Sequence, residues 1–476
     1  MVKVKMSRFL QMKKAALKQL IKELEKEFSY VSVLGTDSFG KIYRVDKNAV
    51  SIADSLWNER GFVVRIHNGL GYSEYSFNDI NDNDILQIAK DIKIRVNNQL
   101  ETLKGNVNIT EYPVIEEKAI ERDFRGEIGI NPETTSDGDI IGKLSGIKDK
   151  IFSSSELLIN GRVIFHEVHI SKIFLSGKKD LSQSYVWSEG YCVAIVRKDD
   201  NVKVGFKAAS GLKGVELIDE IEKNAKSTVD TAVKLLSARS IEPGEYDVIC
   251  TPEVVGMIAH EAFGHGVEMD MFVKHRAKAA EYIGKQVASE LVTMRDGAAS
   301  AKHVSSYMFD DEGVIAQDTV IIENGILKNG LSDTLSALKL GTKPTGNGKR
   351  FSFERKTYAR MTNTFIEAGK DKIEDMIASV KHGYLLASPS SGMEDPKNWG
   401  IQCMVDYGIE IVDGKLTDNI VSPVVLTGYV PDVLKTISML SEKVELGGSG
   451  MCGKGYKEFA KVSDGGPYIK AKVRLG

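Results

Sequence analysis

The chain of 476 residues has few cysteines, no long apolar run and little net charge. Four cysteines are too few for a disulfide framework at this length, which excludes the disulfide-stapled class. No apolar stretch approaches the ~20 residues that a membrane-spanning helix needs. No signal-peptide core follows the first lysines, so we expect a cytoplasmic protein. The formal net charge of -3 gives no electrostatic case for nucleic acid or membrane as a partner.

The length exceeds the usual size of a single hydrophobic core, so several domains are expected. We predict an α+β protein of three parts: an N-terminal α/β module over 1–115, a strand-rich central module with a closing helix over 116–240, and a β-rich C-terminal domain over 241–476. This division rests on helical periodicity over 10–28 and 214–238 and on short runs of alternating apolar and polar residues elsewhere.

The strand-like runs of the central module predict hairpins at Asn160-Gly161 and at Asp199-Asp200-Asn201, because such residues favour tight turns. The same region contains His166-Glu167-Val168-His169, which groups side chains of the metal-binding type. It lies in an alternating run, where residues three apart face opposite sides of a strand. We therefore interpret these histidines as structural.

The strongest chemical signal is the segment His260-Glu261-Ala262-Phe263-Gly264-His265, together with a distant cysteine, Cys452. Thr251-Pro252 is a favourable helix start, which places the two histidines on the helix that follows. Two imidazoles and a thiolate form a ligand set for one zinc ion with an open position for water. The carboxylate between the histidines is a candidate acid–base group.

The spacing of the two histidines departs from the common zinc-binding helix. On a regular α-helix, positions i and i+5 differ by roughly 140°, whereas i and i+4 share a face. A π-type turn would align i with i+5; alternatively, the helix could end at Gly264, whose backbone has wider freedom. We predict that the helix bulges or breaks between His260 and His265. Spacing alone also allows both to be ordinary helix-terminal histidines.

Cys452 lies in a glycine-rich stretch, 446–455, that matches two nucleotide-binding patterns. A dinucleotide site needs a βαβ unit and an acidic residue about 20 positions further on, and too little chain remains. Gly455 stands where a phosphate loop needs Ser or Thr. We interpret the glycines as a tight turn that presents the thiol to a metal. The remaining cysteines lie in apolar runs typical of buried side chains: Cys192, Cys250 and Cys403.

These residues resemble the TldD branch of the TldD/PmbA metallopeptidase family. The similarity is dense over 245–476 and looser before it, and the tail after Lys454 departs from the family's pattern. The matching segments are YDVICTPEVVGMIAHEAFGHGVEMD (246–270), LVTMRDG (291–297), FDDEGVIAQDTVIIENGILKNGL (309–331), PTGNGKR (344–350), RMTNTFIEAG (360–369) and GSGMCGK (448–454).

The resemblance implies a zinc peptidase of the HExxxH type, whose C-terminal domain is catalytic and carries the zinc-binding helix. Its zinc ligands fall on His260, His265 and Cys452. Its catalytic glutamate falls on Glu261, which would activate a zinc-bound water for peptide hydrolysis. The family further implies a homodimer, or a heterodimer with a PmbA-like subunit, whose restricted-access chamber takes small or unfolded peptides.

Four further residues are site candidates. Asn347 and Asn363 lie in turns and are candidates for substrate binding, although turn residues often satisfy their own loops instead. Glu268 and Asp270 follow the histidines closely and are candidate partners for a ligand imidazole N–H, although both are equally explained as surface carboxylates.

Two other functions remain open from the sequence. In one, the zinc is structural and the protein is a non-catalytic regulator, as the family's older description as a modulator of DNA gyrase suggests. In the other, the chain is one subunit of a heterodimeric TldD/PmbA-type protease, active only beside its partner. A closed four-ligand site would favour the regulator, and the sequence offers only three convincing ligands.

Overall fold

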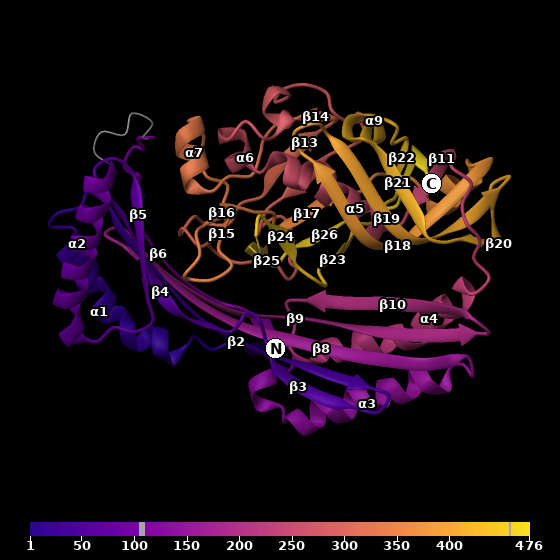
Figure 1. Ribbon diagram of the computed structural model, residues 1–476, viewed down its shortest axis with the longest axis horizontal. Coiled ribbons are helices and arrows are strands. Elements are labelled where there is room, and N and C mark those ends of the chain that lie inside the picture. The colour runs from indigo at the N-terminus through magenta and orange to yellow at the C-terminus, as the bar shows by residue number, and fades with distance from the viewer. Residues whose placement is uncertain (104–109, 457) are drawn as a thin grey trace.

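The computed structural model describes residues 1–103, 110–456 and 458–476. Figure 1 shows a long N-terminal sheet with helices on it, and a C-terminal unit that lies over the sheet. The chain passes from the first part to the second after α4 (Ile218–Leu235). This mixed architecture, with a strand-rich C-terminal half, confirms the predicted α+β fold class.

The N-terminal part is built on one sheet, in which strands follow the order β10-β9-β8-β2-β4-β5. Because β2 pairs with β8 along most of its length, segments from both predicted N-terminal modules share this sheet. The expected boundary at 115 follows residues 104–109, which lie outside the described residues. The strands are β2 (Val31–Asp46), β3 (Val50–Asp54), β4 (Glu59–His67), β5 (Tyr72–Phe77), β6 (Ile120–Arg125), β8 (Leu158–Ser176), β9 (Lys179–Lys198) and β10 (Asn201–Gly211).

Helices pack on this sheet in two pairs. α1 (Arg8–Leu24) buries Leu10, Leu17 and Leu24, which recur every seven positions and so lie on one side of the helix. α1 and α2 (Ile85–Leu103) cover one end of the sheet, and α3 (Asp137–Ser153) and α4 cover the other.

The opposite face of the sheet meets the C-terminal unit. Along β8, Ile173 and Leu175 pack with α1 and α2, whereas Phe174 packs with Phe309 of the C-terminal unit. Lys172 makes an ion pair with Asp311 on the same side. This alternation follows from the period of two along a strand, and it buries the sheet on both faces.

One expected hairpin is present and the other is not. Asp199, with a φ of 53°, and Asp200 lie in the turn between β9 and β10. Asn160-Gly161 lies inside β8 beside a β-bulge, where the register against β9 shifts between Leu158 and Asn160. The prediction of a hairpin there was wrong, because a residue pair that suits a turn also suits a bulge.

The C-terminal unit holds helix α5 (Pro252–Ala259) between two sheets, in contact with β18 and β26. The first sheet contains β11 (Gly244–Cys250), β18 (His382–Asp395), β19 (Gly400–Val412), β20 (Lys415–Val421), β21 (Val424–Tyr429), β22 (Met439–Leu440) and β27 (Ile469–Leu475). The second contains β12 (Met294–Asp296), β13 (Thr319–Glu323), β14 (Ile326–Leu327), β17 (Asn363–Ile366), β23 (Glu445–Gly447) and β26 (Ser463–Gly466).

Short elements complete the described part of the chain, and none of its helices has the length and apolar character of a membrane-crossing helix. The short helices are α6 (Met269–Val273), α7 (Thr334–Leu340), α8 (Ile373–Ala378) and α9 (Val430–Lys435). The two-stranded pairs are β1 (Val2–Lys3) with β7 (Glu127–Ile128), β15 (Gly348–Lys349) with β16 (Tyr358–Ala359), and β24 (Cys452–Lys454) with β25 (Glu458–Ala460).

Candidate metal centre

The helix that carries the two histidines bulges between them. After α5, residues His260–Gly264 form a π-type turn, and the backbone N–H of His265 donates to the carbonyl of His260. This hydrogen bond joins positions i+5 and i, which brings the two histidines to one side of the helix. The predicted irregularity between His260 and His265 is therefore confirmed, in its π-turn form.

Gly264 is needed in this turn because it has no side chain. Its φ of -71° and ψ of -69° are accessible to any residue, so the backbone freedom expected of this glycine is not what the turn uses. A Cβ built on Gly264 would lie 2.1 Å from Sδ of Met361. Glycine is needed here because the turn packs directly against a buried methionine.

The turn brings both imidazoles to the cysteine. Nε2 of His260 lies 3.3 Å from Sγ of Cys452, and Nε2 of His265 lies 3.1 Å from the same sulfur. Cys452 is buried at the start of β24, and the three donor atoms all lie within 4.8 Å of one another. Two distant chain segments thus place three metal-type donors around one point.

The charges of these groups suit a divalent cation. Burial opposes ionisation of Cys452, but hydrogen bonds with His260 and His265 outweigh it and lower the thiol pKa to about 5. Burial also opposes protonation of His265, yet Glu268 and Cys452 raise its pKa to about 10. A metal would replace these protons, and a buried nitrogen and sulfur donor set is the one that zinc prefers. The residues therefore fit zinc.

Glu268 is in contact with His265, one of the three candidate ligands. Its Oε2 lies 3.3 Å from Nδ1 of His265 and 3.0 Å from Nζ of Lys454. Burial opposes ionisation of Glu268, but Lys454 and His265 outweigh it and hold its pKa well below the usual range. Asp270 is linked to His265 only through Lys454 and Glu268, since its Oδ1 pairs with Nζ of Lys454 at 2.6 Å.

Two residues that the sequence analysis missed also support the ligands. Oδ2 of Asp464, on β26, lies 3.2 Å from Nδ1 of His260, although the two are not aligned for a hydrogen bond. The guanidinium of Arg360 donates to the carbonyl oxygens of Cys452, at 3.0 Å, and Glu458, at 2.7 Å. Both residues are remote in sequence from what they contact, so no local pattern could identify them.

A second carboxylate, Glu394 of β18, faces the centre beside Glu261. The side chains of Glu261, His265 and Glu394 bring their ligand atoms within 4.8 Å of one another. Burial and the adjacent Glu261 raise the pKa of Glu394 to about 7, against the opposing charge of His265. Gly392 makes room for this arrangement, because a Cβ there would lie 2.5 Å from Cγ of Glu261. The sequence analysis did not select Glu394.

Known proteins are similar to this chain in sequence and in fold. Residues 243–474 match the family model for the PmbA/TldA metallopeptidase C-terminal domain. The C-terminal half of the chain belongs to the TldD/PmbA family. A metalloprotease of Methanocaldococcus jannaschii is 29% identical over 401 residues, which cover 84% of this chain and 80% of that protein.

A second sequence relative matches about half of the chain, and a solved structure matches nearly all of it. A zinc metalloprotease TldD homolog of Saccharolobus solfataricus is 32% identical over 241 residues, which cover 50% of this chain and 53% of that protein. The structure of TldE from Thermococcus kodakarensis matches 97% of this chain and 100% of its own, with a TM-score of 0.74 at 19% identity. At that identity the match shows a shared fold.

Asn347 and Asn363, in the TldD/PmbA part of the chain, are both fully buried. The amide of Asn347 donates to Asp296 and to the carbonyl of Arg360, and its oxygen accepts from Thr345. Asn363 is bonded in the same complete way, to Gly297, Ser306 and Ser463. These bonds argue against substrate contact and favour the alternative that both amides hold their own loops together.

The cysteine segment is also attached to the N-terminal sheet. Oε2 of Glu189, on β9, accepts from the backbone N–H of Gly450 at 2.6 Å and from Nζ of Lys461 at 2.8 Å. Nζ of Lys461 also donates to the carbonyl of Gly450 at 2.8 Å. Burial opposes ionisation of Glu189, but Lys461 and His166 outweigh it and lower its pKa to about 2.

His166 therefore has a partner that explains its burial. Its Nδ1 lies 3.0 Å from Oε1 of Glu189, and its Nε2 lies 2.7 Å from Oγ of Ser55. His169 bonds to Glu133 and Ser184 in a similar way. Neither histidine belongs to a metal-type cluster among the described residues, in agreement with their interpretation as structural.

Proposed function

We propose that this chain is a zinc-dependent peptidase of the HExxxH type, which hydrolyses small or unfolded peptides. The observation that carries this proposal is the convergence of His260, His265 and Cys452, with Glu261 beside them. Zinc held by these three ligands would supply Lewis acidity, which polarises a substrate carbonyl and lowers the pKa of water.

Glu261 is the acid–base group of the proposed reaction. It follows His260 directly in the chain, but its carboxylate is not one of the three converging nitrogen and sulfur donors. It is half-buried, so it can take a proton from the attacking water and deliver it to the leaving amine. Such proton transfer contributes on the order of 10²–10⁴-fold to the rate.

An unpaired strand edge beside Glu261 supports binding of an extended peptide. β18 pairs with β19 from His382 to Asp395, whereas β11 pairs with β18 only over Gly383–Leu386. Within the described residues, the other edge of Pro389–Asp395 therefore has no strand partner. A peptide that adds to such an edge is held by main-chain hydrogen bonds, which confer little sequence preference.

The test compares two glutamates of the same helical segment. Glu261→Gln keeps the shape of the side chain and removes its basicity, so we expect retained zinc and a loss of at least about 100-fold in kcat toward a fluorogenic peptide. Glu253→Gln, exposed in the first turn of α5, is the matched control and should cleave normally. Undiminished cleavage by Glu261→Gln with full zinc would contradict the role of Glu261.

We propose further that the active form is a dimer with its sites in a restricted-access chamber. The support is the membership of the C-terminal half in the TldD/PmbA family and the fold shared with TldE. Light scattering of the purified chain, alone and mixed with a PmbA-like subunit, distinguishes a homodimer from a heterodimer. Equal cleavage rates for a folded protein and for a short peptide would contradict restricted access.

A further inference from the structure

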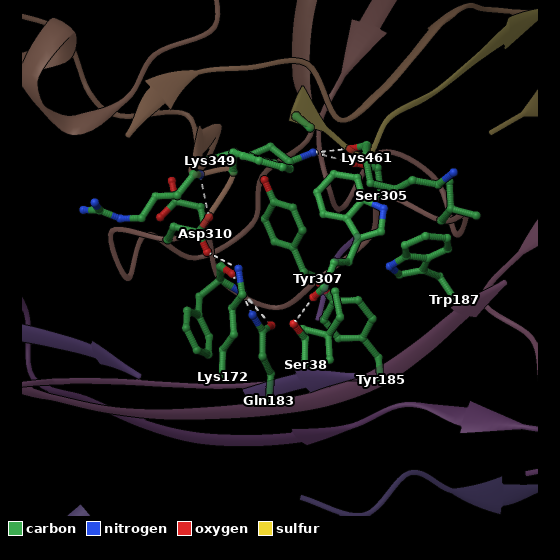
Figure 2. A pocket seen from close by; sticks show the side chains of 18 of the residues that line it. Ser38, Lys172, Gln183, Tyr185, Trp187, Ser305, Tyr307, Asp310, Lys349 and Lys461 are labelled. Atoms are coloured by element: carbon green, nitrogen blue, oxygen red, sulfur yellow. Dashed lines mark hydrogen bonds and ion pairs between the residues drawn. The ribbon is translucent and has the colours of Figure 1, made fainter. Parts of the chain in front are cut away.

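A cavity of about 60 Å³ lies between the N-terminal sheet and the C-terminal unit. Figure 2 shows β-strands of the sheet below it and loops of the C-terminal unit above it. Neither the three proposed zinc ligands nor Glu261 or Glu394 are among its lining residues. The cavity is therefore separate from the metal centre, and the proposed reaction does not use it.

Two hydrogen-bond donors that line the cavity have no acceptor within the described residues. Trp187 is 1% exposed, and its indole N–H has no hydrogen-bond partner among the described residues. Tyr185 is also buried against the cavity (Figure 2), and its hydroxyl makes no hydrogen bond within the described part of the chain. Lys172 pairs with a single carboxylate, Asp311. Unused buried donors are costly, so this part of the lining favours an anionic group.

The same cavity is lined by a carboxylate without an ion pair. Oε2 of Glu59 accepts from the backbone N–H of Phe353 at 2.8 Å, and no salt bridge to Glu59 exists among the described residues. Burial raises the pKa of this carboxyl group to about 7. The charges of Lys172 and Arg350 oppose this rise, but neither forms an ion pair with Glu59 among the described residues, and the three donors of Lys349 are used by Ser305, Met361 and Lys461. Glu59 therefore favours a cationic group in the cavity.

Aromatic rings form another part of the lining. The rings of Trp57 and Trp187 lie edge to face at 6.2 Å, and those of Trp57 and Phe351 at 5.9 Å. Aromatic faces attract cations, and ammonium groups are bound in this way in many proteins. Trp187 already lies against Nζ of Lys461, at 4.5 Å from the ring centroid, so Trp57 and Phe351 are the rings that add to the attraction of Glu59 for a positively charged group.

We propose that this cavity binds a small α-amino acid of the size of glycine or alanine. Its carboxylate would accept from Tyr185, Trp187 and Lys172, and its ammonium group would meet Glu59 and the aromatic rings. An anion alone would leave Glu59 without compensation, and an amine alone would leave the donors unused. At about 10–15 Å³ for each water position, a volume of about 60 Å³ holds roughly four to six non-hydrogen atoms.

The site is connected to the metal centre through the cysteine hairpin. Ala460 and Lys461 line the cavity, and Ala460 pairs with Cys452 across β24 and β25. An amino acid in the cavity would therefore fix the hairpin that presents the thiolate. Small amino acids are final products of peptide hydrolysis, so a role as product sensor rests on the proposed function, whereas the binding itself does not.

Titration of the full chain with glycine and with L-alanine tests the site. Trp57 and Trp187 line the cavity and are two of the three tryptophans, so binding should change the intrinsic fluorescence as well as release heat. We expect one saturable site that persists after removal of zinc by a chelator. Acetate and methylamine, which each carry one of the two charges, and L-phenylalanine, which is too large, should bind at least about tenfold more weakly.

Substitutions in the lining test whether the amino acid binds in this cavity. Glu59→Gln should weaken glycine binding by about tenfold or more, since it removes a charge-assisted hydrogen bond. Glu121→Gln makes the same change on exposed β6 and should bind normally. Should Glu59→Gln fail to fold, Tyr185→Phe, which removes one oxygen, should also weaken binding.

Three results would overturn the proposal: no saturable signal at millimolar glycine or alanine, binding that disappears with zinc, or unchanged affinity in the folded Glu59→Gln and Tyr185→Phe variants. Peptide cleavage is measured on the same samples. Amino-acid binding without any cleavage would contradict the proposed function alone, and cleavage without binding would contradict only this inference.

Discussion

Glu189 of the N-terminal sheet accepts a hydrogen bond from the backbone of Gly450, two residues before the proposed zinc ligand Cys452. The side chain of Lys461 holds the other side of Gly450 and pairs with the same carboxylate. The position of a proposed metal ligand in the C-terminal half thus depends on a residue about 260 positions earlier.

Removal of this carboxylate should loosen the metal centre. We expect Glu189→Ala to lower zinc affinity about 10–100-fold, the usual range for residues that orient metal ligands, because the N–H of Gly450 loses its acceptor and the buried Lys461 loses its ion-pair partner. Competition with a chromogenic chelator measures the change. Glu121→Ala, exposed on β6, should bind zinc normally, and equal affinity in the two variants would contradict a role for Glu189.

The zinc-free protein should have one reactive cysteine. With its pKa lowered to about 5, Cys452 is a thiolate at neutral pH, and its fraction of thiolate falls as the pH drops below that value. Burial raises the pKa of the other three cysteines to about 12 or above, which keeps them protonated: Cys192, Cys250 and Cys403.

Mass spectrometry after iodoacetamide treatment checks this expectation. Alkylation should occur at Cys452 alone at pH 7, persist to about pH 5 and be prevented by zinc. Equal labelling of Cys250, or no protection by zinc, would contradict the assignment of Cys452 as the metal-binding thiolate.

Neutralisation of Glu394 should change the pH dependence of peptide cleavage. Its pKa of about 7 means that the group gains a negative charge beside Glu261 as the pH rises through neutrality. Glu394→Gln removes that charge, so we expect the acid limb of the kcat/KM profile to move to lower pH. Asp418→Asn, exposed on β20, is the control, and identical profiles for native protein and Glu394→Gln would exclude this coupling.

Two glycines of the metal-binding segment should respond differently to the same substitution. Gly264→Ala places a methyl group 2.1 Å from Sδ of Met361, and overpacking of this kind typically costs about 1–3 kcal/mol. A Cβ on Gly266 meets nothing within 4 Å, so Gly266→Ala should leave the free energy of unfolding nearly unchanged. Denaturant unfolding compares the two, and similar values would show that the π-turn tolerates a side chain.

The sequence predicted best where local geometry decides the outcome. The helix start at Thr251-Pro252 and the irregularity before His265 both follow from neighbouring residues. Asn160-Gly161 failed because the pairing of β8 with β9 determines whether such a pair forms a turn or a bulge.

The contacts of the metal centre with distant residues were beyond local patterns. Asp464, Glu394 and Glu189 lie on strands that are remote in sequence from His260 and His265, and only the folded structure brings them to the centre. Glu268 could be predicted as a partner of an imidazole only because it follows His265 by three residues in the sequence. Gly264 was selected correctly for the wrong physical reason, since only the packed structure shows Met361 beside it.

The hydrogen bond between Glu189 and Gly450 also bears on the order of events during synthesis. The sheet that carries Glu189 leaves the ribosome before the hairpin that carries Cys452, so an acceptor for the hairpin already exists when the last ligand emerges. Capture of the proposed metal would then be a late step that depends on the folding of both halves, and we expect a chain with a damaged N-terminal sheet to bind it more weakly.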